Sequence, residues 1–266
     1  MQRERETALV TGASAGIGRE LACVLAERGF DLVVVARRAD ALEELARQCR
    51  KDHRVRVDVV PMDLLAADAP ATLAQRLDGD GLSVDVLVNN AGLMDTGRFV
   101  EIDVANHERL LQLNTFVLTS LTRRLLPGMI ARGHGRILNV ASTSSFQPVP
   151  MLALYAASKA FVLSLSESLG EELKGTGVTV TALCPGITRT DMYDHALHEN
   201  AAARSLPGFL ISDVEDVARE GVAACLAGRA VVVPGISNRL MASYVQMLPR
   251  GFVRGVGGLI GRRSTR

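Results

Sequence analysis

The sequence TALVTGASAGIG, residues 7–18, joins a short apolar run to a segment with glycines at positions 12, 16 and 18. When such a turn links a buried strand to a helix, the backbone can approach a pyrophosphate closely, and the amide groups at the start of the helix bind it. The spacing is GxxxGxG instead of the commoner GxGxxG, and an ordinary tight turn also fits these glycines. Whether this stretch is a pyrophosphate-binding turn or an ordinary tight turn therefore depends on the strands and helices around it.

Further apolar runs follow, and segments long enough to form helices separate them. With Thr7–Val10 they are Asp31–Ala36, Val55–Val60, Val84–Val88, Arg136–Val140, Val178–Leu183 and Ala230–Val233. Strands without polar alternation are typical of a parallel sheet that is covered on both faces. The sequence predicts an α/β fold: one domain over residues 1–266, with a Rossmann-like, doubly wound parallel sheet of about seven strands and helices on both faces.

Composition narrows the class of protein. Apolar residues make up 48% of the 266 residues and the formal net charge is +1, so no overall charge favours nucleic acid. The four cysteines show no CxxC or metal-binding spacing, which predicts reduced thiols. No apolar signal segment follows the charged first residues, and no run is long enough to span a bilayer. We expect a cytoplasmic protein.

The stretch STSSFQPVPMLALYAASK, residues 142–159, offers catalytic chemistry. Tyr155 and Lys159 are four residues apart in a segment rich in Ala, Leu and Ser, so a helix would place them on one face. A nearby ammonium group lowers the pKa of a phenol, and we expect this to make Tyr155 a general acid and base. The hydroxyl of Ser142 could hydrogen-bond the substrate oxygen. An ordinary amphipathic helix with one tyrosine also fits the pair.

The sequence VVVARR, residues 33–38, bears on whether the cofactor is NAD or NADP. A site for NAD usually has a carboxylate after the second strand, whereas an arginine suits the 2′-phosphate of NADP. Here Arg37 and Arg38 follow the strand without an acidic residue, which favours NADP(H), with Arg37 as the phosphate ligand. Two solvated arginines are the alternative. Asp63, after the third strand, either contacts the adenine or caps a helix.

Two further segments carry amides. Asn89, Asn90, Ala91 and Gly92 follow the fourth strand, where open α/β sheets bind ligands, although a structural turn also fits them. Asn114 lies within a leucine-rich segment, 107–129, that we expect to be a buried helix. Its amide is then either satisfied within the core or part of a polar relay.

Taken together, these residues resemble the short-chain dehydrogenase/reductase family. The matching motifs are TGASAGIG at 11–18, Asp63, NNAG at 89–92, Asn114, Ser142, YAASK at 155–159 and PGITRT at 185–190. They occur in the order and with the spacing of that family. A Rossmann-like fold and an NAD(P)-dependent oxidoreductase are what the resemblance implies.

The resemblance also implies residue roles. Tyr155 would exchange the proton, Lys159 would bind the nicotinamide ribose and lower the pKa of Tyr155, Ser142 would orient the substrate oxygen, and Asn114 would hold a water that links Lys159 to solvent. The implied cofactor-binding residues are Gly12, Ser14, Gly16, Ile17, Gly18, Asn90, Gly92, Tyr155, Lys159, Ile187 and Thr190, with Arg37 and Asp63.

Beyond Pro185 the sequence is less informative. Residues 188–212 correspond to the variable segment that covers the substrate, and their apolar and small residues suggest a large, mainly apolar carbonyl or alcohol. His195 and His198 are three residues apart, but no third metal ligand accompanies them, so we predict no metal site.

The extension 235–266 mixes apolar residues with arginine, and Gly251, Gly255, Gly257 and Gly258 should interrupt a long helix there. Seven arginines and no acidic residue follow Glu220. The extension could form a flap on the substrate pocket or a subunit contact. A helix on a membrane surface ranks third.

The leading hypothesis is an NADP(H)-dependent carbonyl reductase or alcohol dehydrogenase. A catalytically silent cofactor-binding sensor or scaffold on the same fold is the alternative. An epimerase or dehydratase of the related extended families is a third, although those chains usually carry a separate substrate domain. The segments 107–129 and 152–173 have apolar residues on more than one face, which predicts a homodimer or homotetramer.

Overall fold

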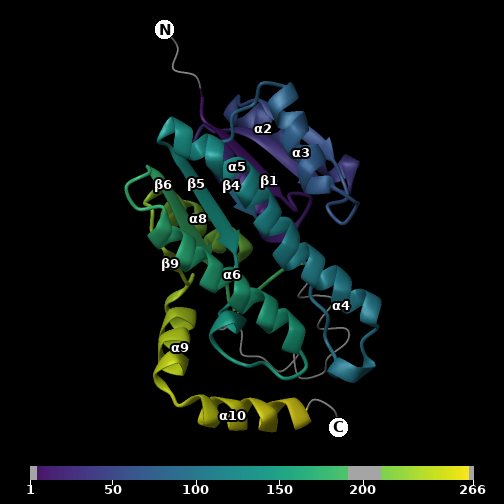
Figure 1. Cartoon of the computed structure of the whole chain (residues 1–266), viewed down its shortest axis with the longest axis vertical. Helices are drawn as coiled ribbons and strands as arrows, with labels where there is room; N and C mark the ends of the chain where they lie inside the picture. Colours follow the sequence, from purple (N-terminus) through teal and green to yellow (C-terminus); the bar gives the residue numbers. More distant parts are fainter. Residues whose placement is uncertain (1–4, 191–210, 264–266) are drawn as a thin grey trace.

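Seven parallel strands form the central sheet of the computed structural model, which describes residues 5–190 and 211–263 (Figure 1). They are β1 (Thr7–Thr11), β2 (Asp31–Ala36), β3 (Val57–Pro61), β4 (Val86–Asn89), β5 (Gly135–Val140), β6 (Val178–Leu183) and β9 (Val231–Val232). The order β3-β2-β1-β4-β5-β6-β9 reverses direction between β1 and β4, the position at which such sheets bind ligands. The predicted fold class is confirmed, and the strand bounds differ from the expected ones by at most two residues.

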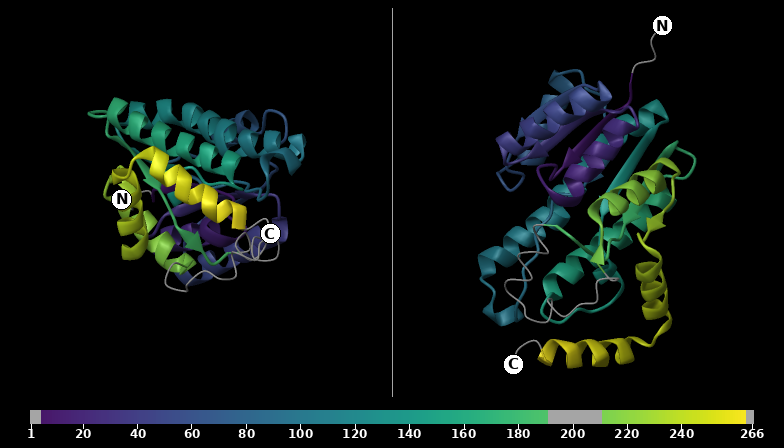
Figure 2. Two further views of the ribbon diagram at one scale, coloured as in Figure 1. Left: turned by 90° about the horizontal axis from the view of Figure 1, so that it is seen from below. Right: turned by 180° about the vertical axis from the view of Figure 1, so that it is seen from behind.

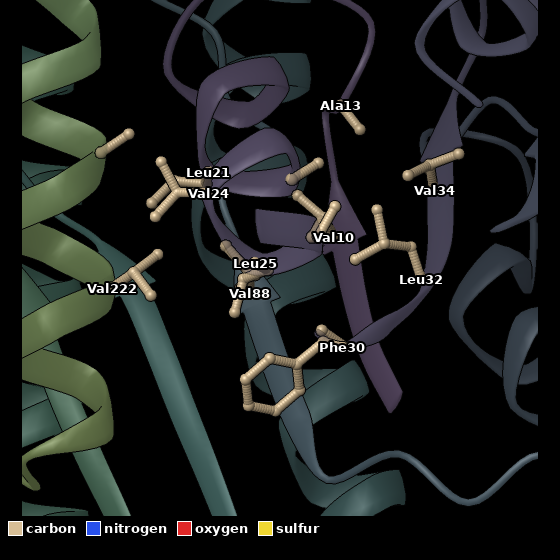
Figure 3. Close-up of a cluster of buried hydrophobic side chains, with 14 of the residues drawn as sticks. Val10, Ala13, Leu21, Val24, Leu25, Phe30, Leu32, Val34, Val88 and Val222 are labelled. Atoms are coloured by element: carbon tan, nitrogen blue, oxygen red, sulfur yellow. The ribbon is translucent and has the colours of Figure 1, made fainter. Parts of the chain in front are cut away.

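Helices cover both faces of the sheet (Figure 2). On one face lie α1 (Gly16–Glu27), α2 (Ala39–His53) and α8 (Val214–Leu226), and on the other lie α3 (Ala69–Gly79), α5 (Leu118–Arg132) and α6 (Ala153–Glu172). Alternate residues of each strand enter the two cores, as Val10 and Leu9 of β1 do. Figure 3 shows Leu21 and Leu25 of α1 near Val10 and Val88 of the sheet.

The predicted helix at 107–129 is longer and less regular than expected. It begins with α4 (Val104–Leu111), continues as a single stretch of π-helix, η2 (Gln112–Val117), and runs on as α5 through Pro127. A π-helix is uncommon and is frequently found at functional sites. Here it contains Asn114, one of the expected site residues.

The expectation that glycines interrupt the C-terminal segment is wrong. After α9 (Ile236–Met247), the chain forms one continuous helix, α10 (Arg250–Arg263), in spite of its glycines. Both helices lie at the end of the molecule toward which the strands run (Figure 1). Across the described residues, no helix combines the length and apolar character that crossing a membrane requires.

A chain of buried amides and hydroxyls links the sheet to two helices. The Asn89 side-chain amide donates to Thr122 Oγ1 of α5 at 3.0 Å and to Asn139 Oδ1 of β5 at 2.9 Å. Asn139 is fully buried and donates in turn to Ser166 Oγ of α6 at 2.9 Å. Because these groups have no access to water, each depends on the others for its hydrogen bonds.

Replacing Asn139 should therefore destabilise the fold strongly. Asn139→Ala removes the acceptor of Asn89 and the donor to Ser166, and we expect the free energy of unfolding to fall by about 2 to 3 kcal/mol. Urea denaturation followed by circular dichroism measures the loss.

Thr181→Val provides the matched control on the adjacent strand. Thr181 is also fully buried, but its hydroxyl oxygen has no hydrogen-bond partner. Exchanging the hydroxyl for a methyl group should leave the stability unchanged or raise it. Equal losses in the two variants would show that the buried chain of amides contributes nothing specific.

Candidate active site

The glycine loop after β1 is packed too tightly for side chains. Gly12 has φ +68°, in the left-handed region that favours glycine. A Cβ atom on Gly18 would overlap the Gly12 carbonyl and the side chain of Asn90. The N-cap of α1, Ala15, offers no side-chain hydrogen bond, and the first turn holds no acidic residue. The start of α1 thus leaves backbone amides for an anion, as the pyrophosphate of a dinucleotide requires.

Thr11 and Asn90 hold this loop in place. Thr11 Oγ1 donates to the Val88 carbonyl at 3.1 Å and accepts from the backbone amides of Asn90 and Ala91 at 3.0 and 3.1 Å. The Asn90 amide donates to the Thr11 carbonyl at 2.9 Å. The Asn90 side chain thus supports the glycine loop. Gly12 lies so near this side chain that a Cβ atom on Gly12 would not fit.

Arg38 also contacts the glycine loop. Its guanidinium donates to the Ser14 carbonyl at 3.0 Å and lies 3.4 Å from Ser14 Oγ. Arg37 and Arg38 are both exposed and no acidic residue separates them from β2. The sequence singled out Arg37 as the phosphate ligand, but Arg38 is the arginine whose position the loop fixes.

Ser142, Tyr155 and Lys159 come together at the carboxyl end of β5. Ser142 follows that strand and caps the 3-10 helix η3 (Thr143–Phe146), while Tyr155 and Lys159 lie on the first two turns of α6. The Ser142 hydroxyl lies near enough to the Tyr155 phenol to lower its pKa. Lys159 Nζ donates to the Val140 carbonyl at 2.8 Å and lies 5.7 Å from the centre of the Tyr155 ring. The structure thus brings together the three side chains that the sequence singled out.

The expected lowering of the Tyr155 pKa by Lys159 is not found. Burial raises the pKa of Tyr155, and the hydrogen bond from Ser142 opposes the rise only in part. Burial also lowers the pKa of Lys159 to about 8. The ammonium is directed at the Val140 carbonyl and not at the phenol, so desolvation outweighs charge attraction. Tyr155 therefore retains its proton at neutral pH in this arrangement.

Asn114 is a satisfied buried amide, one of the two interpretations that its sequence position leaves open. Its side-chain oxygen accepts from the Leu93 amide at 2.8 Å, and its nitrogen donates to the Leu93 carbonyl at 2.9 Å and to Ser158 Oγ at 3.0 Å. A Cβ atom on Gly92 would lie 3.2 Å from Asn114 Oδ1 and 3.5 Å from Lys159 Nζ. Glycine at this position therefore allows Asn114 and Lys159 to approach the same backbone.

The loop after β6 is held by the C-terminal extension. Strand β7 (Ile187–Thr188) pairs with β8 (Ile211–Ser212) at the two ends of the predicted substrate lid. Asn238 of α9 donates to Ser212 Oγ at 3.0 Å, and its side chain occupies the space that a Cβ on Gly186 would need. Ile187 is 37% exposed, and the Thr190 methyl lies where a Cβ on Gly16 would be in contact with it.

The remaining predictions are less well defined. Asp63 is exposed and accepts a hydrogen bond from the Leu65 amide in a local turn; it does not cap a helix, because the N-cap of α3 is Asp68. His195 and His198, with most of the predicted lid, lie outside the described residues. Within the described parts of the chain, no group of three or more His, Cys, Asp or Glu side chains could hold a metal ion.

The family model for short chain dehydrogenases matches residues 6–201. This chain belongs to the short-chain dehydrogenase family. It is 35% identical over 191 residues to a very-long-chain 3-oxoacyl-CoA reductase of Bos taurus, a match of 70% of this chain and 61% of that protein. It is 37% identical over 187 residues to nodulation protein G of Rhizobium sp. (strain N33), covering 70% and 75% of the two chains. The match thus spans less than two thirds of the length of the bovine reductase.

Solved structures of short-chain dehydrogenases are similar over nearly the whole chain. An enzyme of Sphingobium yanoikuyae in complex with NADPH gives a TM-score of 0.80 at 34% identity and covers 94% of both chains. The bulky-bulky ketone specific alcohol dehydrogenase of Comamonas testosteroni gives 0.77 at 30% identity, with 93% of this chain and 96% of that one covered.

The sequence interpretation missed four residues that shape the site of this short-chain dehydrogenase. They are Thr11, Arg38, Ser158 and Asn238, and each acts by holding another segment in place. Thr11 and Arg38 are next to residues that were selected, so proximity was a usable signal. Nothing in the sequence connects Asn238 with Gly186, which lies 52 positions earlier.

Gly18→Ala should weaken cofactor binding. The added methyl group must displace the Gly12 carbonyl or the Asn90 side chain, and we expect the affinity for NADPH to fall about tenfold or more. Fluorescence titration with NADPH measures the change.

Gly170→Ala is the matched control. Gly170 lies inside α6 with only an ordinary contact for a new Cβ atom, so this variant should bind NADPH normally and gain about 0.5 to 1 kcal/mol of stability. Normal NADPH affinity in Gly18→Ala would contradict the proposed closeness of loop and cofactor.

Proposed function

We propose that this chain is an NADP(H)-dependent oxidoreductase that transfers a hydride between nicotinamide and the carbonyl or secondary alcohol group of an apolar substrate. The observation that carries the proposal is the position of Tyr155 beside the buried Lys159, whose Nζ lies 5.7 Å from the centre of the tyrosine ring, with Ser142 at the end of the adjoining strand. These groups stand at the carboxyl end of β5, next to the loop that fits a dinucleotide.

Ser142, Tyr155 and Lys159 have different roles in the proton transfer. The bound nicotinamide supplies or accepts the hydride. In the reducing direction, Ser142 and Tyr155 donate hydrogen bonds to the carbonyl oxygen, and the Tyr155 proton moves to it as negative charge develops there. The raised pKa of Tyr155 keeps the phenol protonated at neutral pH, so it holds the proton that is to be transferred. Lys159, which remains mostly protonated below its pKa of about 8, stabilises the phenolate that is left.

NADP(H) is preferred over NAD(H) in this proposal because of the arginines after β2. Arg38 is fixed against Ser14 by its hydrogen bond to the loop carbonyl, and the exposed Arg37 lies beside it. Two guanidinium groups at this position attract a 2′-phosphate, and no carboxylate is present there to repel it. The similarity to a structure in complex with NADPH supports the same choice.

An apolar substrate is inferred from the relatives and from the predicted lid. One similar protein is a reductase of very-long-chain 3-oxoacyl-CoA, and another is an alcohol dehydrogenase specific for bulky-bulky ketones. The segment 188–212 of this chain contains apolar residues that would suit such molecules.

We also propose that the protein is cytoplasmic and forms a homodimer or homotetramer. The oligomer is inferred because two aromatic side chains, Phe116 of η2 and Phe161 of α6, are 56% and 43% exposed.

The alternative of a silent cofactor-binding scaffold requires that the site be impaired. Instead Asn114, Ser142, Tyr155 and Lys159 are all present, and the buried side chains of Asn114 and Lys159 are both held by hydrogen bonds, to Ser158 and to the Val140 carbonyl. The geometry therefore favours an enzyme.

Tyr155→Phe tests the proposed acid and base. Without the phenol oxygen no proton can reach the carbonyl oxygen from this position, and we expect turnover to fall by at least about a hundredfold. NADPH binding should remain within about a factor of three, because the ring and Lys159 stay in place. Oxidation of NADPH is followed across a panel of bulky apolar ketones and aldehydes.

Tyr244→Phe makes the same chemical change at an exposed tyrosine of α9 and should leave turnover unaltered. A Tyr155→Phe protein with full activity would remove Tyr155 from its role. If the unaltered chain binds NADPH tightly but reduces no carbonyl compound, the result favours the alternative of a catalytically silent scaffold.

Arg37→Ala and Arg38→Ala test cofactor preference. We expect each to weaken NADPH binding about tenfold or more and to change NADH binding little, because only NADPH carries the phosphate. Lys51→Ala, at the far end of α2, removes the same charge and should have no effect on either cofactor. Equal losses for NADPH and NADH would assign the phosphate contact to other residues.

A further inference from the structure

The C-terminal helix α9 displays an apolar stripe to its surroundings. Four of its large apolar side chains follow one another at intervals of four, four and three residues, which places them on one face of the helix. They are between 61% and 84% exposed: Ile236, Leu240, Tyr244 and Met247. Apolar residues exposed singly are normal, but a continuous stripe indicates a binding surface.

The orientation of this stripe is fixed by the opposite face of α9. Asn238 and Ala242 are buried, and Asn238 is tied to the loop before the helix and to Ser212. Arg239 donates to Glu220 of α8 at 3.2 Å. Because these contacts hold the inner face against the domain, the apolar stripe faces away from it, and none of the residues that the structure describes buries the stripe.

Basic and apolar residues are also exposed on the helix that follows. Phe252 of α10 is 58% exposed, and the neighbouring Arg250 and Arg254 are exposed as well. Every charged residue after Glu220 is an arginine, so apolar and basic groups alternate here without any acidic residue. This combination matches an amphipathic helix that lies on an anionic lipid surface.

The composition of helix α10 disfavours a helix in water. Five of its 14 residues are glycine, each of which disfavours a helix by roughly 1 kcal/mol relative to alanine. Space is open around the positions that Cβ atoms on Gly251 and Gly255 would take. Figure 1 shows α10 running across the end of the molecule below the sheet. A short helix of this composition is marginal in water and gains stability on a surface that buries its apolar side.

We propose that α9 and α10 form a docking surface for membranes that contain anionic lipids, with the stripe from Ile236 to Met247 and Phe252 entering the interface and the arginines contacting head groups. A second copy of this chain fits the surface less well. A two-fold interface would place the same arginine-rich patch against itself, with no acidic residue after Glu220 to compensate.

Vesicle binding tests the proposal without cofactor or turnover, so its result is independent of the proposed function. The purified full chain is sedimented with phosphatidylcholine vesicles and with vesicles that also contain phosphatidylglycerol. We expect binding to the anionic vesicles that weakens as salt is added, and little binding to phosphatidylcholine alone.

Two double variants and a control test whether the exposed residues of α9 and α10 bind the vesicles. Leu240→Glu with Tyr244→Glu, and Arg250→Gln with Arg254→Gln, should each reduce binding about tenfold or more. Val100→Glu with Val104→Glu changes two valines that are 82% and 68% exposed elsewhere, and it should bind as the unaltered chain does. Circular dichroism confirms that each variant is folded.

The sequence contains no tryptophan, so Tyr244→Trp introduces a single reporter. Its emission should shift to the blue and become protected from iodide when anionic vesicles are added, whereas Val100→Trp should show neither change. Absence of vesicle binding would overturn the proposal. A self-association that Leu240→Glu with Tyr244→Glu abolishes, without vesicle binding, would assign the surface to a second copy instead.

Discussion

A buried ammonium group sets the arrangement of the site. Lys159 is only 6% exposed, and burial of an amine favours its neutral form, as the lowered pKa shows. Its compensation is the hydrogen bond to the Val140 carbonyl at the end of β5. Glycine at position 92 leaves room for this arrangement. A Cβ atom there would lie 3.5 Å from Lys159 Nζ and 3.2 Å from Asn114 Oδ1, and a larger side chain would push the ammonium away from β5.

The sheet and α6 could be predicted from the sequence because their signals are local. A strand that is buried on both faces must be almost entirely apolar, as Asp31–Ala36 is after its first residue. The spacing of Tyr155 and Lys159 is likewise a property of one helix. Both predictions required no knowledge of distant contacts.

What could not be predicted depends on contacts between distant segments. The pKa of Tyr155 depends on where the Lys159 ammonium points, and that direction is set by a carbonyl of another element. The link between Asn238 and Gly186 joins two segments that no pattern relates. Arginines 37 and 38 are equivalent by sequence, and only the position of the Ser14 carbonyl distinguishes them.

The same contacts connect the outer surface of α9 with the predicted substrate lid. Asn238 hydrogen-bonds Ser212 at one end of the lid and fills the space beside Gly186 before the other end. Its side chain is buried, so it has no water to replace a lost partner. Helix α9 therefore cannot move relative to the domain without disturbing β7 and β8.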